Sequence, residues 1–289
     1  MAAWDEEDTS LDCLVIYMAM NRQLHFIAGL PRSGSTLLSA ILRQNPSFRA
    51  SISSPLADMF ASLLNVMSSD SAFASRISDD QRTRVLRALC DAYYAHESPE
   101  AVVFDTNRRW NSFLPVLAQL FPTVKLIVCV RSPAWILDSL EQQVQRNAIR
   151  PAKFFKEEQG GTVYSRVSAL MSGGMVSSAI HGLRQAWFGE FAAHIIAVRY
   201  DSVTEKPTEV MDRLYDLLCV QRFRHDFENL DYDEPEFDAE LGLPGFHRVA
   251  CRVERPHRTT ILPPDLFRQY HHSFWDDEAQ NPRGVTVLC

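Results

Sequence analysis

The sequence lacks a run of apolar residues long enough to cross a membrane. The longest candidate near the start, Leu11–Met20, spans about ten residues, where a membrane helix needs about twenty, and is interrupted by Asp12. The acidic stretch Asp5–Asp8 precedes it, where a secretory signal would carry positive charge. We therefore expect a cytoplasmic protein with no membrane span. Residues 1–19 are interpreted as an N-terminal extension, either disordered or a start-site artefact, and 20–289 as a single domain.

Paired cysteines and metal-binding spacings are also missing. The 6 cysteines are scattered without a C-x-x-C pair, which argues against a zinc site or a disulfide framework and favours reduced thiols. The 9 histidines are dispersed without ligand spacing, so we predict no metal. The net charge of −7 disfavours a general nucleic-acid surface but leaves room for a local basic cleft.

What the sequence does contain is enough apolar residues for a large core, at 46% of 289 residues. Apolar runs that alternate with amphipathic stretches predict an α/β fold: a three-layer sandwich with a central parallel sheet. The four expected strands cover residues 24–28, 101–104, 125–130 and 194–198. Expected helices follow at 37–42, 56–67, 82–94, 111–120, 180–191 and 208–218.

The stretch His25–Arg43 reads as strand, loop and helix. Its loop has the spacing of a phosphate-binding loop, with Gly29, four residues, Gly34 and then two hydroxyl residues. Backbone N–H groups at such a helix start favour a bound anion. Ser35 stands where a nucleotide triphosphatase has its lysine, and the cation instead lies earlier, at Arg32. This pattern suits an anionic group shorter than a triphosphate.

The loop resembles that of the sulfotransferase family. Pro31–Thr36, PRSGST, matches the family's 5′-phosphosulfate loop P-[KR]-[SA]-G-[ST]-[ST] at every position. The resemblance implies the donor 3′-phosphoadenosine 5′-phosphosulfate and a phosphate-binding turn of the P-loop type. It implies that Arg32 stabilises the charge that develops on the leaving phosphate. The residues implied to hold the 5′-phosphate are Ser33, Gly34, Ser35 and Thr36.

A second motif lies about a hundred residues downstream. Arg131 follows the clearest strand of the chain, and Ser139 follows eight residues later on the expected helix. In sulfotransferases the pattern R-x-P-x-x-x-x-x-S binds the 3′-phosphate of the donor. Physically, the arginine offers a planar charged fork and the serine adds a hydroxyl donor. A site that binds the 3′-phosphate distinguishes this donor from ATP, which has no 3′-phosphate.

Two further segments resemble donor-contacting parts of the family. Tyr200, in R-Y-D-x-V after the fourth strand, resembles a residue that lies near the adenosine, although a strand-end tyrosine is also an ordinary core-edge residue. The segment Val249–Pro264 contains V-E-R and resembles the C-terminal donor-covering loop of tyrosylprotein sulfotransferases. By that alignment Arg252 or Arg255 reaches the 3′-phosphate.

The base that takes the acceptor proton is less clear from the sequence, because Thr106 occupies the position of the family's lysine. Asp105 is the predicted catalytic base, with Asp58 as the second choice. Arg108 and Arg109 are candidate anion contacts. The alternative is structural, with Asp105 capping the following helix and the arginines on a solvated face.

Together these motifs predict a sulfotransferase that moves a sulfuryl group to an acceptor hydroxyl, without nucleic acid as a partner. A peptide tyrosine is the first expected acceptor, because the motif order is nearest to the tyrosylprotein branch, and a small phenol, sugar or lipid is the alternative. The alternative hypotheses are a P-loop kinase and a non-catalytic binding protein of the same fold. For the oligomeric state, the sequence is compatible with a homodimer. The acidic run Asp231–Glu240 is interpreted as a solvated linker, or else as a selector of basic acceptors.

Overall fold

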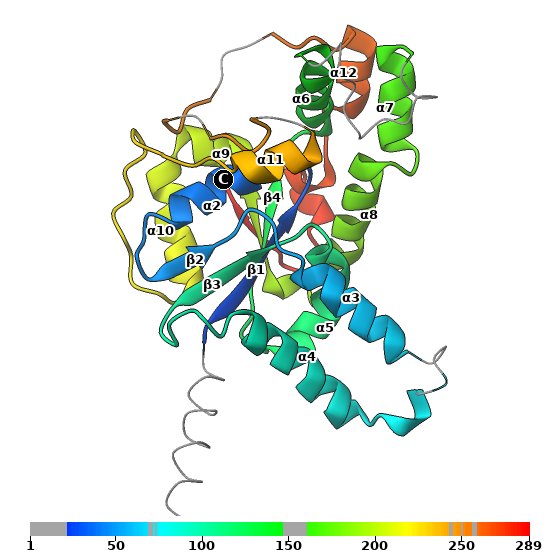
Figure 1. Cartoon of the computed structure of the whole chain (residues 1–289). Coiled ribbons are helices and arrows are strands. Elements are labelled where there is room, and N and C mark those ends of the chain that lie inside the picture. The colour runs from blue at the N-terminus through cyan, green and yellow to red at the C-terminus, as the bar shows by residue number, and fades with distance from the viewer. Residues whose placement is uncertain are drawn as a thin grey trace, which may run out of the picture.

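One six-stranded sheet, with all strands parallel, organises the molecule (Figure 1). The computed structural model describes residues 22–68, 72, 74–146, 161–242, 245–249, 251–255 and 259–289. The strand order across the sheet is β2-β3-β1-β4-β5-β6. The strands are β1 (Leu24–Gly29), β2 (Phe48–Ala50), β3 (Val102–Thr106), β4 (Leu126–Val130), β5 (Ile195–Arg199) and β6 (Thr286–Leu288).

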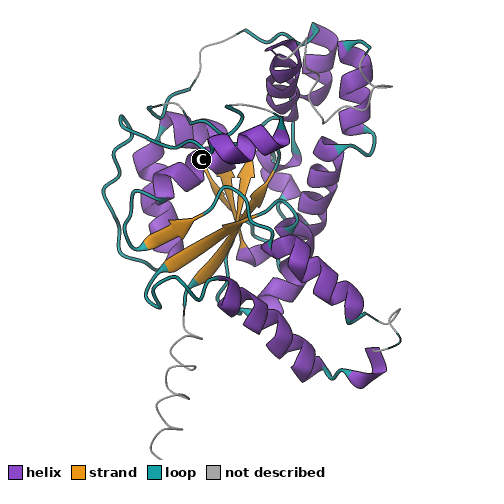
Figure 2. Ribbon diagram, viewed as in Figure 1, coloured by secondary structure: helices purple, strands orange, loops and turns teal. Residues whose placement is uncertain are grey.

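Helices occupy most of the rest of the described chain (Figure 2). The α-helices are α2 (Ser35–Leu42), α3 (Leu56–Val66), α4 (Asp79–Tyr93), α5 (Trp110–Leu120), α6 (Pro133–Arg146), α7 (Val163–Met171), α8 (Met175–Trp187), α9 (Tyr200–Glu205), α10 (Pro207–Leu218), α11 (Pro235–Leu241) and α12 (Pro264–Tyr270). Short 3₁₀ helices are η1 (Ala74–Arg76), η3 (Ala192–His194), η4 (Phe274–Asp276) and η5 (Glu278–Gln280).

The sheet separates two hydrophobic cores, which makes the fold a three-layer sandwich. In β4, Leu126 and Val128 point into the core that α3, α4, α5 and α8 cover, whereas Ile127 and Cys129 point into the core that α2 and α10 cover. Both faces are therefore apolar, as in parallel sheets with helices on each side. Burial raises the pKa of the Cys129 thiol to about 12, in keeping with a core residue.

The fold class expected from the sequence is confirmed, and the four expected strands are present with ends shifted by one or two residues. Two strands were not expected. Strands β2 and β6 have 3 residues each and lie at opposite edges of the sheet, paired with β3 and β5. Strands this short carry no alternating pattern that a sequence could reveal, so their identity depends on the neighbour they pair with.

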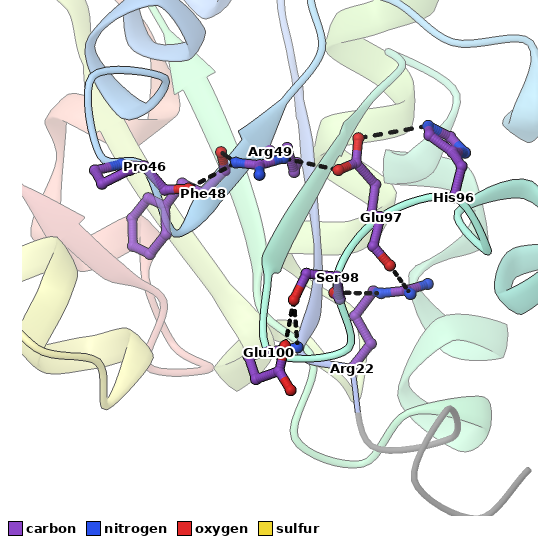
Figure 3. Close-up of polar contacts among 8 residues, drawn as sticks. All are labelled: Arg22, Pro46, Phe48, Arg49, His96, Glu97, Ser98 and Glu100. Atoms are coloured by element: carbon purple, nitrogen blue, oxygen red, sulfur yellow. Dashed lines mark hydrogen bonds and ion pairs between the residues drawn. The ribbon is translucent and has the colours of Figure 1, made fainter. Parts of the chain in front are cut away.

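A polar network fastens the β2 edge of the sheet (Figure 3). Arg49 of β2 donates from Nε to the Glu97 carboxylate at 2.7 Å, and its NH1 group donates to the carbonyl of Pro46 at 2.7 Å. Arg22, just before β1, donates to the Glu97 carbonyl at 2.6 Å. The turn before β3 is thus tied both to β2 and to the start of β1.

The expectation for Asp231–Glu240 as a solvated linker is wrong over its second half. This half forms α11, whose Asp238 side chain is fully buried. Figure 1 shows α11 above the carboxyl ends of the strands. The expectation for residues 1–19 lies outside the described residues.

Candidate functional site

A cavity of about 590 Å³ opens at the carboxyl ends of the strands. This is the edge at which open parallel sheets bind ligands. The loops after β1, β3, β4 and β5 each contribute to its wall, and α11 with the covering segment, residues 245–249 and 251–254, covers it. The cavity-lining residues from the sequence predictions are Arg32, Gly34, Ser35, Thr36, Asp58, Thr106, Arg108, Arg109, Arg131, Tyr200 and Arg252.

Two glycines give the loop after β1 its shape. Gly29 has φ 134°, and a Cβ there would lie 2.2 Å from the carbonyl oxygen of Cys129 in β4. Gly34 has φ 99°, and a Cβ there would lie 2.7 Å from Cδ2 of Tyr200. Only glycine adopts such a backbone without strain and also admits these close neighbours. The loop is therefore packed against the ends of both β4 and β5.

Helix α2 begins at Ser35 with its N-terminus at the cavity. Gly34 is its N-cap and no side chain accepts a hydrogen bond there, so the first N–H groups of the helix stay available for an anion. Ser35 and Thr36 line the cavity, as a phosphate-binding role requires. Ser33 lies beneath the loop instead, because its hydroxyl donates to the carbonyls of Leu30 at 2.6 Å and Cys129 at 2.8 Å.

Arg32, at φ 59°, lines the cavity. Its Nε donates to Oγ of Ser139 on α6 at 3.2 Å, and NH1 donates to the carbonyl of Phe246 at 2.7 Å. Its guanidinium also lies 4.4 Å from the centre of the Phe246 ring. The predicted loop cation and the predicted 3′-phosphate serine are therefore neighbours, although Ser139 itself is 8% exposed and does not line the cavity.

Arg131 and Tyr200 form the wall beyond the loop. The guanidinium of Arg131 lies 4.1 Å from the centre of the Tyr200 ring, and its NH1 donates to the Arg32 carbonyl at 3.4 Å. These contacts orient the guanidinium at the end of β4, beside the ring that packs on Gly34. The sequence predicted both residues as donor contacts, and the structure brings them together.

Of the two arginines predicted in the C-terminal segment, one reaches the cavity. Arg252 lines it and forms an ion pair with Glu254 at 2.5 Å. Arg255 instead pairs with Glu205 and with Asp201 of α9. The segment thus contributes one arginine whose charge is partly balanced by its own neighbour.

The placement of Asp105 does not suit a base that must touch the acceptor, so the structure corrects this prediction. The side chain is fully buried and absent from the cavity wall. Its carboxylate accepts hydrogen bonds from Ser54 at 2.5 Å, Tyr94 at 2.5 Å and Trp110 at 2.6 Å. Burial raises the pKa of Asp105, and these three donors oppose that rise. The alternative of a helix cap is also wrong, because Arg109 is the N-cap of α5.

Polar residues after β3 line the cavity on the other side of the loop. Asp58 of α3 forms an ion pair with Arg109. Arg108 has no ion pair or hydrogen bond among the described residues, and the surrounding protein lowers the pKa of its guanidinium. Thr106 is 5% exposed, and its buried Oγ1 has no hydrogen-bonding partner within the described chain. An unpartnered hydroxyl and an unpaired cation in one cavity are features that a bound ligand would satisfy.

Sequence reasoning missed His247 and its partner Asp238. His247 lines the cavity from the covering segment, and its Nδ1 lies 2.6 Å from Oδ1 of Asp238. Nine residues separate the two, which corresponds to no motif. No local signal marks Asp238 either, because it is one of three acidic residues in α11.

A scan with protein-family models matches residues 25–224 to the model described as "Sulfotransferase family". The chain belongs to the sulfotransferase family. The curated Nodulation protein NoeE of Sinorhizobium fredii (strain NBRC 101917 / NGR234) is 26% identical over an alignment of 209 residues, and the match covers 65% of this chain. The chain spans about half of that relative's length, at 48%.

Solved structures similar to this sulfotransferase family member include three sulfotransferases. A sulfotransferase domain from the curacin biosynthetic pathway has a TM-score of 0.46 at 15% identity, covering 93% of this chain and 92% of its own. A sulfotransferase from Alicyclobacillus acidocaldarius has a TM-score of 0.45 at 16% identity, with 76% and 90% covered. Sulfotransferase STF9 from Mycobacterium avium has a TM-score of 0.45 at 14% identity, with 96% and 78% covered.

The family match spans the phosphate-binding loop, Arg131 and Tyr200, but ends before the covering segment. The cavity residues Arg252 and His247 therefore lie outside it. In the described parts of this sulfotransferase family member, no group of three or more His, Cys, Asp or Glu side chains is placed to hold a metal ion. No helix within the same parts is long and apolar enough to cross a membrane.

Proposed function

We propose that this family member transfers a sulfuryl group from 3′-phosphoadenosine 5′-phosphosulfate to an acceptor hydroxyl. One observation carries the proposal: the loop Pro31–Thr36 and the cation of Arg131, about a hundred residues apart in sequence, line one cavity. A helix N-terminus for one phosphate and an arginine fork for another fit a nucleotide with 5′- and 3′-phosphates.

In this proposal the donor lies along the β1, β4 and β5 side of the cavity. The 5′-phosphate binds at the N-terminus of α2, over Ser35 and Thr36, and the 3′-phosphate binds at Arg131. Tyr200 packs beneath the adenosine end. Arg32 extends from the loop itself, so its guanidinium is placed to stabilise the charge that develops on the leaving phosphate. A preorganised donor of this kind contributes about 3 kcal/mol.

The acceptor then lies on the β2 and β3 side. The strand order places β3 and β2 on the opposite side of β1 from β4 and β5. An in-line transfer needs the acceptor oxygen and the leaving oxygen on opposite sides of the sulfur. The residues that face the acceptor are therefore Asp58, Thr106, Arg108 and Arg109, whose side chains line that part of the wall.

The charge of this part of the wall favours an acceptor that carries a negative group next to its hydroxyl. Arg109 is already paired with Asp58, whereas Arg108 has no partner among the described residues. A tyrosine in an acidic peptide satisfies this requirement, and so does an anionic phenol or sugar. The proposal of a tyrosine acceptor therefore depends on the charge of this part of the wall, and it is independent of the proposal for the donor.

Isothermal titration calorimetry with the desulfated product, 3′-phosphoadenosine 5′-phosphate, tests the donor. We expect micromolar binding by the wild type and a loss of about tenfold to a hundredfold in Arg131→Ala, because a charged hydrogen-bonded pair is removed. Arg222→Ala is the matched control, since Arg222 pairs with Asp212 and Asp216 on α10 and does not line the cavity. No binding of this nucleotide by the wild type would exclude the proposed donor.

The same experiment distinguishes a sulfotransferase from the two alternative functions, a kinase and a non-catalytic binding protein. Tight, magnesium-dependent ATP binding in place of 3′-phosphoadenosine 5′-phosphate would indicate a P-loop kinase, although Ser35 stands at the position of the kinase lysine. Binding of the donor with no release of product, with water or any hydroxyl as acceptor, would indicate a non-catalytic binding protein.

A further inference from the structure

A buried aspartate and a cavity histidine form a dyad in the segment that covers the site. Asp238 of α11 is 0% exposed and His247 is 16% exposed, measured on their side chains. Oδ1 of Asp238 lies 2.6 Å from Nδ1 of His247, and Oδ2 accepts the backbone N–H of the same residue at 2.9 Å. One carboxylate therefore fixes both the main chain and the ring of His247.

This contact sets the tautomer of the imidazole. A carboxylate can only accept a hydrogen bond, so the proton between the two groups belongs to Nδ1. In the neutral ring Nε2 then carries the lone pair and is the nitrogen that can accept a proton. Nε2 has no hydrogen-bonding partner among the described residues. The ring is further held between Phe237 and Phe246, at centroid distances of 5.3 Å and 4.9 Å.

The dyad lies next to the loop cation. Phe246, the neighbour of His247, accepts a hydrogen bond from Arg32 at 2.7 Å and packs its ring against the same guanidinium. His247 and Arg32 both line the cavity. A base on the covering segment would thus stand near the reacting end of the donor.

The other proton acceptors of the cavity wall are engaged. Asp58 is paired with Arg109 and Glu254 with Arg252, so each of these carboxylates already has an arginine as its partner. Asp105 does not reach the cavity. Among the described residues of the wall, His247 alone combines an open nitrogen with a fixed orientation.

We propose that His247 is the general base of the transfer and that Asp238 positions it. The inference rests on the proposed sulfotransferase function. The acceptor O–H gives its proton to Nε2, and the acceptor oxygen forms a bond to the sulfur. The bond between the sulfur and the bridging oxygen breaks, and its electron pair stays on the leaving 3′-phosphoadenosine 5′-phosphate. The imidazolium returns its proton to water after the products leave.

The test measures release of 3′-phosphoadenosine 5′-phosphate from the donor, with water and with 4-nitrophenol as acceptors, so that no natural acceptor is needed. We expect His247→Gln to lower kcat about a hundredfold or more, as loss of a general base does, with the affinity for 3′-phosphoadenosine 5′-phosphate within about threefold of wild type. In this variant the acidic limb of the pH–rate profile should also disappear, because the group that titrates there is gone. Added imidazole restores turnover in His247→Gly.

Asp238→Asn supplies the second readout. The amide can accept only one of the two hydrogen bonds that the carboxylate accepts from His247, so the ring loses its fixed orientation. We expect kcat to fall by about tenfold and the pH–rate profile to change, with the affinity for 3′-phosphoadenosine 5′-phosphate within about threefold of wild type. His181→Gln, on the exposed face of α8, is the matched control and should behave like wild type.

The outcomes distinguish the inference from the function on which it rests. A wild type that neither binds the nucleotide nor releases it from the donor overturns the proposed function. A wild type that turns over, with His247→Gln retaining kcat within threefold or keeping the acidic limb, overturns the dyad alone. His247→Gln could instead lose kcat and nucleotide affinity in parallel, without imidazole rescue in His247→Gly. That result would mean that Asp238 and His247 only stabilise the covering segment, and it would also overturn the inference.

Discussion

Arg32 Nε donates a hydrogen bond to Ser139 Oγ at 3.2 Å, which joins the phosphate-binding loop to α6 over 107 residues of sequence. The same side chain reaches Phe246 through a second hydrogen bond and a ring contact. One guanidinium therefore links the loop, the proposed 3′-phosphate end and the cover of the cavity.

Replacement of Arg32 by alanine should slow transfer more than it weakens binding. The guanidinium acts on charge that develops only as the sulfur leaves, so we expect kcat to fall by about a hundredfold or more and the Kd of 3′-phosphoadenosine 5′-phosphate to rise less than tenfold. Steady-state kinetics and calorimetry measure the two quantities, with Arg222→Ala as control. A rise in Kd as large as the fall in kcat would mean that Arg32 only binds the donor.

Gly34→Ala should both strain the loop and displace Tyr200. The new Cβ would lie 2.7 Å from the Tyr200 ring at a φ of 99°. Gly173→Ala is the matched control, because Gly173 has φ 95° with nothing within 4 Å of a Cβ. We expect both variants to lose about 1 kcal/mol of unfolding free energy from the backbone, and only Gly34→Ala to lose nucleotide binding. Equal effects on binding would show that the Tyr200 contact is unimportant.

Asp105→Asn separates a structural role from a catalytic one. Three donors converge on this carboxylate, and an asparagine would turn an N–H group toward at least one of them. We expect a loss of about 2 kcal/mol in the free energy of unfolding, with kcat within about threefold of wild type. Urea denaturation and donor turnover measure these. Unchanged stability with turnover abolished would restore Asp105 as the base.

His25 should make the fold sensitive to acid. Burial lowers the pKa of His25 to about 4, from an ordinary value of 6.5, and Nδ1 accepts the backbone N–H of Lys125 at 3.1 Å. The unfolded chain therefore binds a proton between pH 6.5 and 4 that the folded protein does not. The contribution of neutral His25 to the free energy of unfolding is complete above the pKa of the unfolded chain. About 3 kcal/mol of that free energy is lost as the pH falls toward the pKa of the folded protein.

His25→Asn keeps an acceptor for the Lys125 N–H and removes the titrating ring. The free energy of unfolding of this variant, measured in urea at several pH values from 7 to 4.5, should therefore depend less on pH than that of the wild type. Identical pH dependence in both proteins would contradict a neutral, buried His25.

Arg108→Gln tests the charge of the acceptor. With a tyrosine peptide flanked by glutamates, we expect KM to rise by about tenfold, because one charged contact is lost, and the affinity for the nucleotide to stay unchanged. The same peptide with glutamines in place of glutamates should not distinguish the variant from the wild type. Arg109→Gln is the comparison, since Arg109 is already paired with Asp58. No difference between the peptides would argue for a neutral acceptor.

The sequence was most informative where a single segment carries its own pattern. Strand β4 is a continuous apolar run, and β1 is apolar apart from His25. The loop between Gly29 and Thr36 has a spacing that is typical of a phosphate-binding turn. Strands β2 and β6 were missed because three residues at a sheet edge acquire their identity from the neighbouring strand.

The candidate site was predictable only in its donor half. Arg131 and Tyr200 directly follow strands β4 and β5, which places them at the cavity by topology alone. Asp105 is the next-to-last residue of β3, and its side chain points to the opposite face from that of Thr106, because successive residues of a strand alternate. Thr106 therefore takes the cavity position. Asp238 reads as part of an acidic run, and nothing local reveals that α11 buries its carboxylate against His247.

The order of the strands has a consequence for how such an enzyme can be altered. The proposed donor contacts follow β1, β4 and β5, whereas the residues proposed to face the acceptor follow β2 and β3, on the other side of β1 in the sheet. Selection or engineering can therefore rebuild the segments 51–68 and 106–109 to accommodate new acceptors while the nucleotide end keeps its chemistry. In the proposed arrangement, β1 forms the boundary between the donor side of the cavity and the acceptor side.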